Sequence, residues 1–215
     1  MTLPLRFAAD LFLIATACSA PASLAGEAEG GQPIGVVTRV QNEASVRSGA
    51  QVIRAITGTP VHLQAELQTG ADARLEVTFN DQTMLTLGEH ASMSIDAYVY
   101  DPEKGAGEAL LQTTQGAFRF VTGKIKQLKD KNIAVITPVA EIGVRGTEFW
   151  GGPIEAEYGV LLLEGEVAVS TKEGTVLLSK PGEGTRIAPQ LGPPTSPSAW
   201  DAAMIARAVA TVSFR

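Results

Sequence analysis

The chain has 215 residues, of which 23 are acidic and 17 basic, and its formal net charge is −6 with both histidines neutral. A mildly acidic chain without a block of basic residues argues against nucleic acid as a partner. The length is enough for one well-buried domain, or at most two small ones.

Residues 1–25 have the features of a secretory signal peptide. Arg6 is followed by an apolar stretch at residues 11–17, and residues 23–25 (Ser-Leu-Ala) place small side chains at a cleavage site. The apolar stretch is shorter than the roughly 20 residues that span a bilayer. We therefore expect a mature chain that begins at Gly26, has no transmembrane segment and is periplasmic or secreted. An uncleaved N-terminal membrane anchor is the alternative.

Cys18 is the only cysteine in the sequence. It follows Ala15-Thr16-Ala17, which resembles a lipoprotein box with Ala where Leu, Val or Ile is usual. Lipid attachment at Cys18 would make the protein an outer-membrane lipoprotein, but we favour a small apolar residue of the leader. Cleavage after Ala25 would leave no cysteine, which excludes disulfides and thiol chemistry.

Residues 34–190 predict one all-β domain, preceded by a flexible segment at residues 26–33. Short alternating segments recur roughly every 8–12 residues between Gly-rich turns, as in a sandwich or roll of short antiparallel strands. The predicted strands are 34–40, 44–47, 51–54, 75–79, 83–87, 94–100, 110–113, 117–121, 133–136, 160–163, 167–170 and 176–178.

Two of these strand pairs are predicted hairpins. Residues 75–79 and 83–87 flank the turn at 80–82, and residues 110–113 and 117–121 flank Gly116. A faint likeness between residues 69–77 and residues 137–144 raises the alternative of two duplicated or stacked β units.

Neither a metal site nor a catalytic set can be assembled from the sequence. His62 and His90 lie in separate strand-like segments and lack the partners that a triad or a His-based metal site requires. The loop at residues 101–108 carries Asp101, Glu103 and Glu108, but calcium loops have a denser acidic series. We therefore expect a hairpin connection there, and a protein that is not an enzyme and has no metal or cofactor.

A lysine series follows, comprising Lys124, Lys126, Lys129 and Lys131. These side chains could bind an anionic lipid or glycan. Lysines that alternate with apolar residues more often form a solvated face, which is the interpretation we favour.

Residues 137–149, Thr-Pro-Val-Ala-Glu-Ile-Gly-Val-Arg-Gly-Thr-Glu-Phe, are the most informative segment. Thr137 and Pro138 end the preceding strand, because proline has no N–H for a sheet ladder. Gly143 and Gly146 bracket Val144-Arg145 and allow positive φ or a close approach to a neighbour. We expect these four residues, Thr137, Pro138, Gly143 and Gly146, to shape a turn.

Arg145, Thr147 and Glu148 are the candidate binding residues in this segment. The planar guanidinium of Arg145 could bind an anionic ligand. It could instead pair with Glu148, Glu141 or a backbone carbonyl and hold two sheets in register. We favour the structural role, since a buried turn needs its donors and acceptors satisfied.

The segment is similar to the signature of the FecR-domain family, bacterial envelope proteins with the pattern TP-x-A-x-x-GVRGT-x-F. All letters of the pattern are present. The resemblance extends from Ile34 to Ile187. It includes a TG-x-x-S/A…F-x-DG-x-x-L-x-LG stretch at 69–88, a G-x-x-R-F-x-T/V-G hairpin at 116–123 and an L-x-G-x-V turn at 163–167. Gln82 stands where the family usually has Gly after Asp, which could change the type of that turn.

The resemblance also sets an expectation for the class of protein. The best-known members are iron-siderophore signalling regulators with a cytoplasmic anti-sigma segment, a transmembrane helix and a long periplasmic part. Here a predicted leader stands in place of the first two, and the C-terminal extension is too short for their receptor-contacting domain. The resemblance therefore implies a stand-alone exported FecR domain and does not extend to sigma-factor control.

Residues 191–215 predict a Pro-rich linker and a short C-terminal helix. Ser198 and Asp201 resemble a capping box with Asp in place of Glu. Apolar side chains then follow at helical spacings, and we expect them to dock on the β domain rather than bind a partner. They are Trp200, Ile205, Ala208, Val209 and Val212.

The sequence thus predicts an exported, non-enzymatic binding or signalling module of the bacterial cell envelope. Its partner would be an envelope protein or a glycan. The alternative is a structural or adhesive scaffold of a surface or periplasmic assembly.

Overall fold

The computed structural model of the chain describes residues 31–189 and 192–215. The predicted signal peptide (1–25), Cys18, and residues 26–30 of the segment expected to be flexible lie outside the described residues. No helix within the described ranges is both long enough and apolar enough to cross a membrane.

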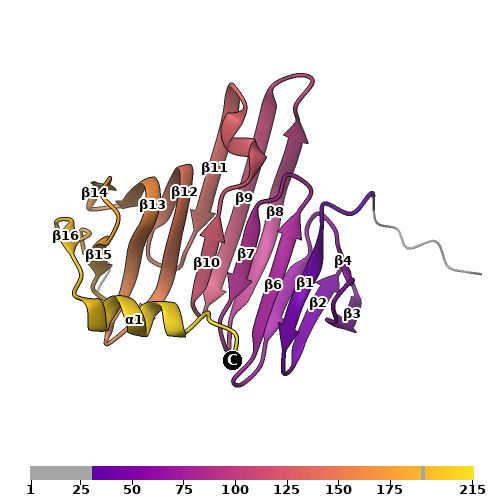
Figure 1. The fold of residues 1–215 in the computed structure, drawn as a ribbon, viewed down its shortest axis with the longest axis horizontal. Helices are drawn as coiled ribbons and strands as arrows, with labels where there is room; N and C mark the ends of the chain where they lie inside the picture. The colour runs from indigo at the N-terminus through magenta and orange to yellow at the C-terminus, as the bar shows by residue number, and fades with distance from the viewer. Residues whose placement is uncertain (1–30, 190–191) are drawn as a thin grey trace, which may run out of the picture.

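The described strands form one curled sheet with a short helix at the C-terminal end, so the all-β prediction is confirmed (Figure 1). The strands are β1 (Gly35–Gln41), β2 (Ala44–Ser48), β3 (Gln51–Arg54), β4 (Pro60–Val61), β5 (Glu66–Thr69), β6 (Arg74–Phe79), β7 (Met84–Leu87), β8 (Ser92–Asp101), β9 (Ala106–Gln115), β10 (Phe118–Val121), β11 (Asp130–Ile136), β12 (Glu141–Ile154), β13 (Glu157–Thr171), β14 (Gly174–Leu178), β15 (Glu183–Ile187) and β16 (Ser198–Ala199). A 3₁₀ helix, η1 (Lys124–Gln127), joins β10 to β11, and the α-helix is α1 (Ala202–Ala210).

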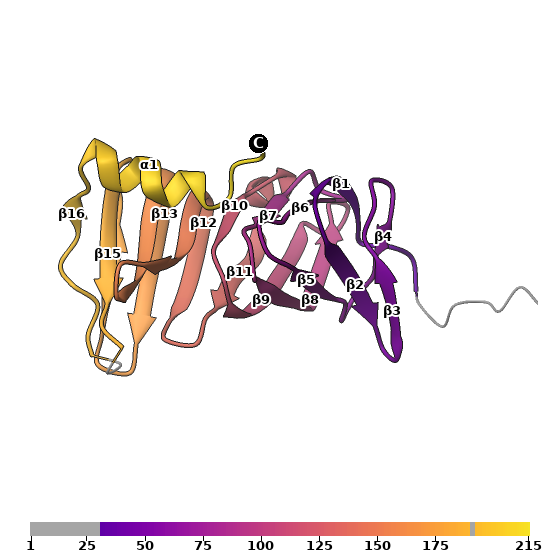
Figure 2. The ribbon, with the colours of Figure 1, turned by 90° about the horizontal axis from the view of Figure 1, so that it is seen from below.

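The sheet folds back on itself and encloses the main core (Figure 2). Its strand order is β3-β2-β5-β8-β9-β11-β12-β10-β7-β6-β1-β4, so β12 joins two layers. One layer holds β8 and β9, and the other holds β6 and β7. The rings of Phe79 on β6 and Tyr98 on β8 stack with centroids 5.0 Å apart, which shows that the layers face each other.

The first predicted hairpin is confirmed and the second is wrong. β6 pairs with β7 as expected, but β9 pairs with β8 and β11, whereas β10 pairs with β7 and β12. The chain changes layer at Gly116, whose φ is 83°. A Cβ there would overlap the backbone of Ala91, so this glycine allows a close crossing rather than a hairpin turn. The crossover also explains why β9 and β11 are parallel, because parallel neighbours need a long connection.

Residues 160–163 and 167–170 were expected to be separate strands, and this is also wrong. They are parts of the single strand β13, which is interrupted only by an irregularity of register opposite residues 145–149. Gly146 and Gly165 face each other there with φ of 64° and 84°. Positive φ at an extra residue is the mark of a glycine bulge, so the glycines bend two long strands instead of ending them.

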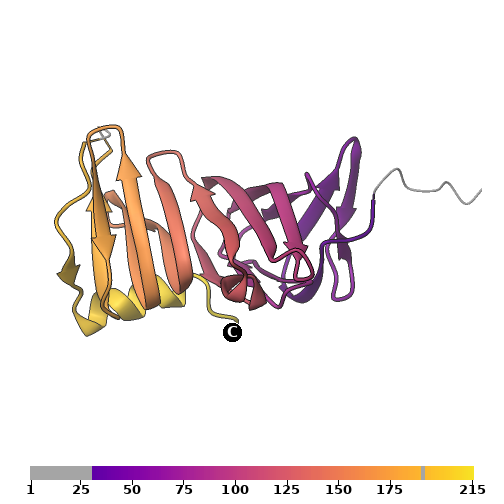
Figure 3. The same ribbon diagram turned by 90° about the horizontal axis from the view of Figure 1, so that it is seen from above.

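The C-terminal helix docks on the domain, as predicted (Figures 1 and 3). The rings of Trp150 and Trp200 meet edge to face at 6.2 Å, and the Trp150 indole N–H donates to Thr211 Oγ1 at 2.9 Å. The predicted cap is wrong in position. Asp201, not Ser198, is the N-cap, and its carboxylate accepts from the Met204 N–H at 2.7 Å.

Candidate functional site

The sheet divides at the signature segment. β13 pairs with one edge of β12 along its length. The other edge is shared, because β11 pairs with residues 141–143 and β10 with residues 148–151. Since β11 and β10 belong to different layers, they diverge on either side of residues 144–147. Among the described strands, none pairs with this edge of β12 between those two partners.

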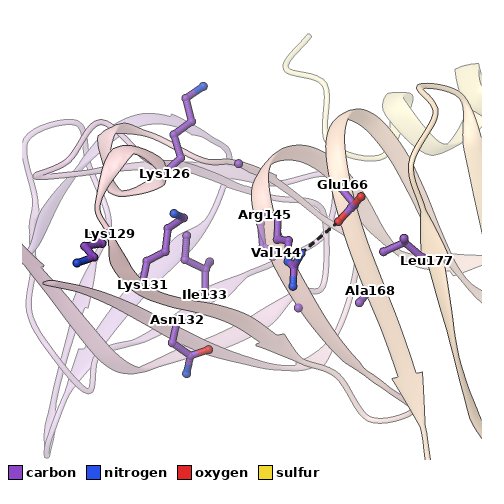
Figure 4. Close-up of a pocket in the computed structure, with 12 residues that line it drawn as sticks. Lys126, Lys129, Lys131, Asn132, Ile133, Val144, Arg145, Glu166, Ala168 and Leu177 are labelled. Carbon is purple, nitrogen blue, oxygen red and sulfur yellow. Dashed lines mark ion pairs between the residues drawn. The ribbon is translucent and has the colours of Figure 1, made fainter. Parts of the chain in front are cut away.

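A groove of about 950 Å³ opens where the strands diverge (Figure 4). One wall is β11 at Lys131–Ile133, and the opposite wall is β12 at Gly143–Gly146. We call this space the fork groove. Its floor extends over β13 and β14 through Ala168 and the half-exposed Leu177, and its outer rim carries Lys126 and Lys129.

Four cationic side chains line the fork groove, against a single carboxylate, that of Glu166. The cations are Lys126, Lys129, Lys131 and Arg145. Lys131 Nζ donates to the Leu128 carbonyl at 2.8 Å, and this hydrogen bond holds the Lys131 side chain in place. The fold thus brings together two sets of residues that the sequence kept apart, and it concentrates positive charge on an acidic protein.

Arg145 does not hold two sheets in register, so the favoured structural role was wrong. Its side chain is 83% exposed, and within residues 31–189 and 192–215 its one ion pair is with Glu166, with Nη1 and Oε1 3.7 Å apart. Glu148 pairs instead with Arg119, whose Nε and Nη2 both donate to Glu148 Oε1, at 2.9 and 2.7 Å. The signature arginine extends from β12 towards solvent at the groove, where an anionic ligand can reach it.

Thr147 is the residue of the signature that joins β12 to its neighbouring segments. It is buried, and its hydroxyl donates to the Glu166 carbonyl at 2.7 Å. The Thr122 hydroxyl accepts from the Thr147 N–H at 3.0 Å and donates to the Thr147 carbonyl at 2.9 Å. These contacts tie β12 to β13 on one side and to Thr122, which follows β10, on the other, at the place where the β12–β13 ladder is irregular. Thr147 is therefore a structural residue, out of reach of a ligand.

Thr137 and Pro138 form the turn between β11 and β12, as predicted for the signature. The Thr137 N–H donates to the Ala140 carbonyl at 2.8 Å, and its hydroxyl accepts from the Ala140 N–H at 2.9 Å. Gly146 has positive φ, and the stem of Lys126 lies beside it. Gly143 does not have positive φ and lies within the regular β11–β12 pairing.

Comparison with known proteins identifies the family. The family model described as "FecR protein" matches residues 65–176, slightly more than half of the chain. The chain belongs to the FecR family. A search of curated proteins found no match.

Two solved structures of a candidate anti-sigma factor from Parabacteroides distasonis share the fold. The first is 20% identical with a TM-score of 0.55, and the match covers 67% of this chain and 63% of that one. The second is 20% identical with a TM-score of 0.52, covering 66% and 62%. The matched part of this chain thus spans less than two thirds of either protein.

Asp81, in the FecR stretch at residues 69–88, is a positioning residue, although the sequence predicted only a turn there. It is fully buried, and its carboxylate accepts from Thr83 N–H at 3.0 Å, Thr83 hydroxyl at 2.7 Å, Tyr98 hydroxyl at 2.8 Å and Ile125 N–H at 3.0 Å. The Asp81 carbonyl also accepts from the Lys124 N–H at 2.7 Å. Asp81 thus fixes η1, the segment that carries Lys126 into the groove. The spacing F-x-D in the FecR pattern was the signal that pointed to it.

Two further features belong to this group of hydrogen bonds around Asp81. Burial, and then the hydrogen bond to Asp81, raise the pKa of Tyr98, so its hydroxyl stays a proton donor. Gln82 has a φ of 69°, so the turn keeps the backbone conformation that suits the family's usual glycine, with a side chain in its place.

The remaining candidates of the sequence lie elsewhere. His62 follows β4, and His90 lies in the turn before β8, so neither is within a strand. The Asp101 loop is a hairpin connection, as predicted. The Lys104 ammonium group forms an ion pair with the Asp101 carboxylate, and their hydrogen bond lowers the pKa of that carboxyl group. Within residues 31–189 and 192–215, no group of three or more His, Cys, Asp or Glu side chains is arranged to hold a metal ion.

Proposed function

We propose that this FecR-family chain is an exported, non-enzymatic binding or signalling module of the bacterial cell envelope, and that the fork groove is its ligand site. The observation that carries the proposal is the groove itself. Lys126, Lys129 and Lys131, from the stretch that runs from η1 into β11, meet Arg145 of β12 there, around the carboxylate of Glu166. A concave surface with one dominant sign of charge concentrates ligands of the opposite sign.

Two other observations support the wider role. Residues 1–25 have the features of a leader, which favours export. The structural neighbours are named as an anti-sigma factor, which favours a role in signalling through contacts with other proteins.

The binding half of the proposal is tested with anionic probes. We expect the full chain to bind at least one of polyglutamate, hyaluronan and phosphatidylglycerol vesicles, and to bind more weakly as salt rises, because exposed charges are screened beyond about 10 Å at 0.1 M. Arg145→Glu should abolish this binding. Arg54→Glu, the same charge change on the exposed strand β3 at the far end of the sheet, should not. Equal binding by both variants would refute the groove as the site.

The export half is tested separately by fractionating the producing cells and sequencing the N-terminus of the protein. We expect periplasmic or secreted protein that begins at Gly26. A lipid-modified Cys18 would favour the lipoprotein alternative, and an intact Met1 on cytoplasmic protein would refute export.

A scaffold is the second candidate, and one feature of the sheet favours it. All four residues of the edge strand β3 are exposed, including Val52 at 49% and Ile53 at 37%. An open apolar edge can pair with another chain. If the protein assembles through this edge, sedimentation velocity should show oligomers that Ile53→Lys dissociates. A monomer at all concentrations would refute the scaffold.

A further inference from the structure

The walls of the fork groove present main-chain groups as well as charges. Alternate residues of a strand direct their N–H and C=O groups to opposite edges. Asp130 donates its N–H to the Gly105 carbonyl beside β9, whereas Thr137 donates to Ala140 at the start of β12. Odd-numbered residues of β11 therefore face β12. At Lys131 the main chain faces the groove, because the pairing with β12 ends with the pair Ala134–Gly143.

The opposite wall follows the same rule. Ala140 accepts from Thr137 of the β11 side, so Ala140, Ile142 and Val144 direct their main-chain groups towards β11. Ile142 is paired there with Val135, and the last pair is Ala134 with Gly143, after which β12 runs on, among the described strands, without a partner strand on this edge until Glu148. The groove is thus bounded by two strand edges that, within the described chain, have separated from each other and have taken no other strand at these residues.

We propose that the ligand of the fork groove is an extended acidic peptide segment of a partner protein, whose main chain pairs with the open edge of β11. This inference rests on the proposed function and names the ligand class. Addition of a strand to an open edge supplies main-chain hydrogen bonds, and alternate side chains supply specificity. Charges alone would suit any polyanion, whereas main-chain groups at an open strand edge suit a peptide.

The dimensions and the charges agree with this ligand. The open part of β11, residues 130–132, spans about 10 Å at a rise of ~3.3 Å per residue, which matches a peptide of three or four residues. Side chains on one face of such a peptide recur every ~6.6 Å. Carboxylates at alternate positions would reach Arg145 and Lys131 on the two walls, and Lys126 and Lys129 on the rim. The exposed Leu177 and neighbouring Ala168 offer an apolar surface to the rest of the segment.

The test uses the full chain and fluorescence anisotropy of a labelled ten-residue peptide of alternating Thr and Glu. We expect saturable binding, no binding of the matching Thr–Lys peptide, and a loss of at least about tenfold in affinity for Arg145→Glu, the factor that ~1.4 kcal/mol represents. Arg54→Glu serves as the matched control and should bind as the wild type does.

The decisive probe is the same acidic peptide with N-methyl groups on its central residues, which keeps every charge but removes the main-chain donors. We expect at least about a tenfold loss of affinity for it. Equal binding of the two peptides would overturn strand pairing. Binding of hyaluronan but not of the peptide would overturn this inference and leave the proposed anionic site standing. Binding of neither probe, nor of phosphatidylglycerol vesicles, would overturn both.

Discussion

Asp81 offers the sharpest test of how the fold supports the groove. Replacing it by alanine removes the acceptor of four hydrogen bonds in a site with no exposure to solvent. The Tyr98 hydroxyl and the Ile125 N–H would be left as buried donors without this partner. Each such donor costs ~1–3 kcal/mol, so we expect Asp81→Ala to lower the free energy of unfolding by about 3–5 kcal/mol.

The assay is thermal and urea unfolding followed by circular dichroism. For a domain of this size, each kcal/mol shifts Tm by ~2–4 °C, so the expected loss is roughly 6–20 °C. Asp96→Ala is the matched control, because Asp96 is exposed and, among the residues that the structure describes, accepts only from the Ser94 hydroxyl. A Tm for Asp81→Ala within about 1 °C of the wild type would refute the reasoning. Hydrogen exchange should also accelerate in η1, since two of the backbone contacts of η1 are to Asp81.

Four other outcomes follow from the same structure. Gly165→Ala should lower Tm, since its φ is 84° and a Cβ would lie 2.5 Å from the Gly146 carbonyl oxygen, whereas Gly174→Ala, with its nearest atom at 3.9 Å, should not. Arg145→Ala should leave the unfolding free energy within about 0.5 kcal/mol, as for an exposed side chain, and a clear loss of Tm would restore its structural role. Trp200→Ala should cost about 3 kcal/mol, the low end for a buried aromatic at the edge of a core, and should expose the C-terminal helix to limited proteolysis; resistance equal to wild type would contradict the docking. Glu66 has a pKa below its ordinary value of 4.5, chiefly through its hydrogen bond from Gln68. Its contribution to stability is therefore present above about pH 4.5 and lost as pH falls through the folded-state pKa, so Glu66→Gln should flatten that part of the acid-unfolding curve, and an unchanged curve would exclude Glu66 as its source.

Local pattern located most of the strands and the C-terminal helix, but it missed β5 and β15 and did not predict how β9, β10 and β13 are connected. Alternation in residues 75–79 and the turn that follows predicted the β6–β7 hairpin, because the two strands that pair are neighbours in the sequence. The apolar spacing around Trp200 predicted a docked helix for the same reason. Glycine was harder to interpret. Gly116 and Gly165 both have positive φ. The chain changes layer at Gly116 and forms a bulge at Gly165, whereas the sequence pattern predicts a turn at each.

The site was visible only in part. The signature segment and the lysine series were each singled out, but their meeting depends on β11 and β12 diverging, which no local pattern encodes. The structural role expected for Arg145 was wrong, because Thr147 makes the hydrogen bonds beside the bulge at Gly146 and none of them involves an arginine. The role of Asp81 was missed since its partners, Tyr98 and Ile125, are distant in sequence.

The most direct test of the account is hydrogen–deuterium exchange of the full chain with and without saturating polyglutamate. We predict that the ligand slows exchange in residues 124–133 and 143–147, the two walls and the rim of the fork groove. Protection confined to β3 or to α1, with these two segments unchanged, would contradict the claim that the divided sheet is the binding site.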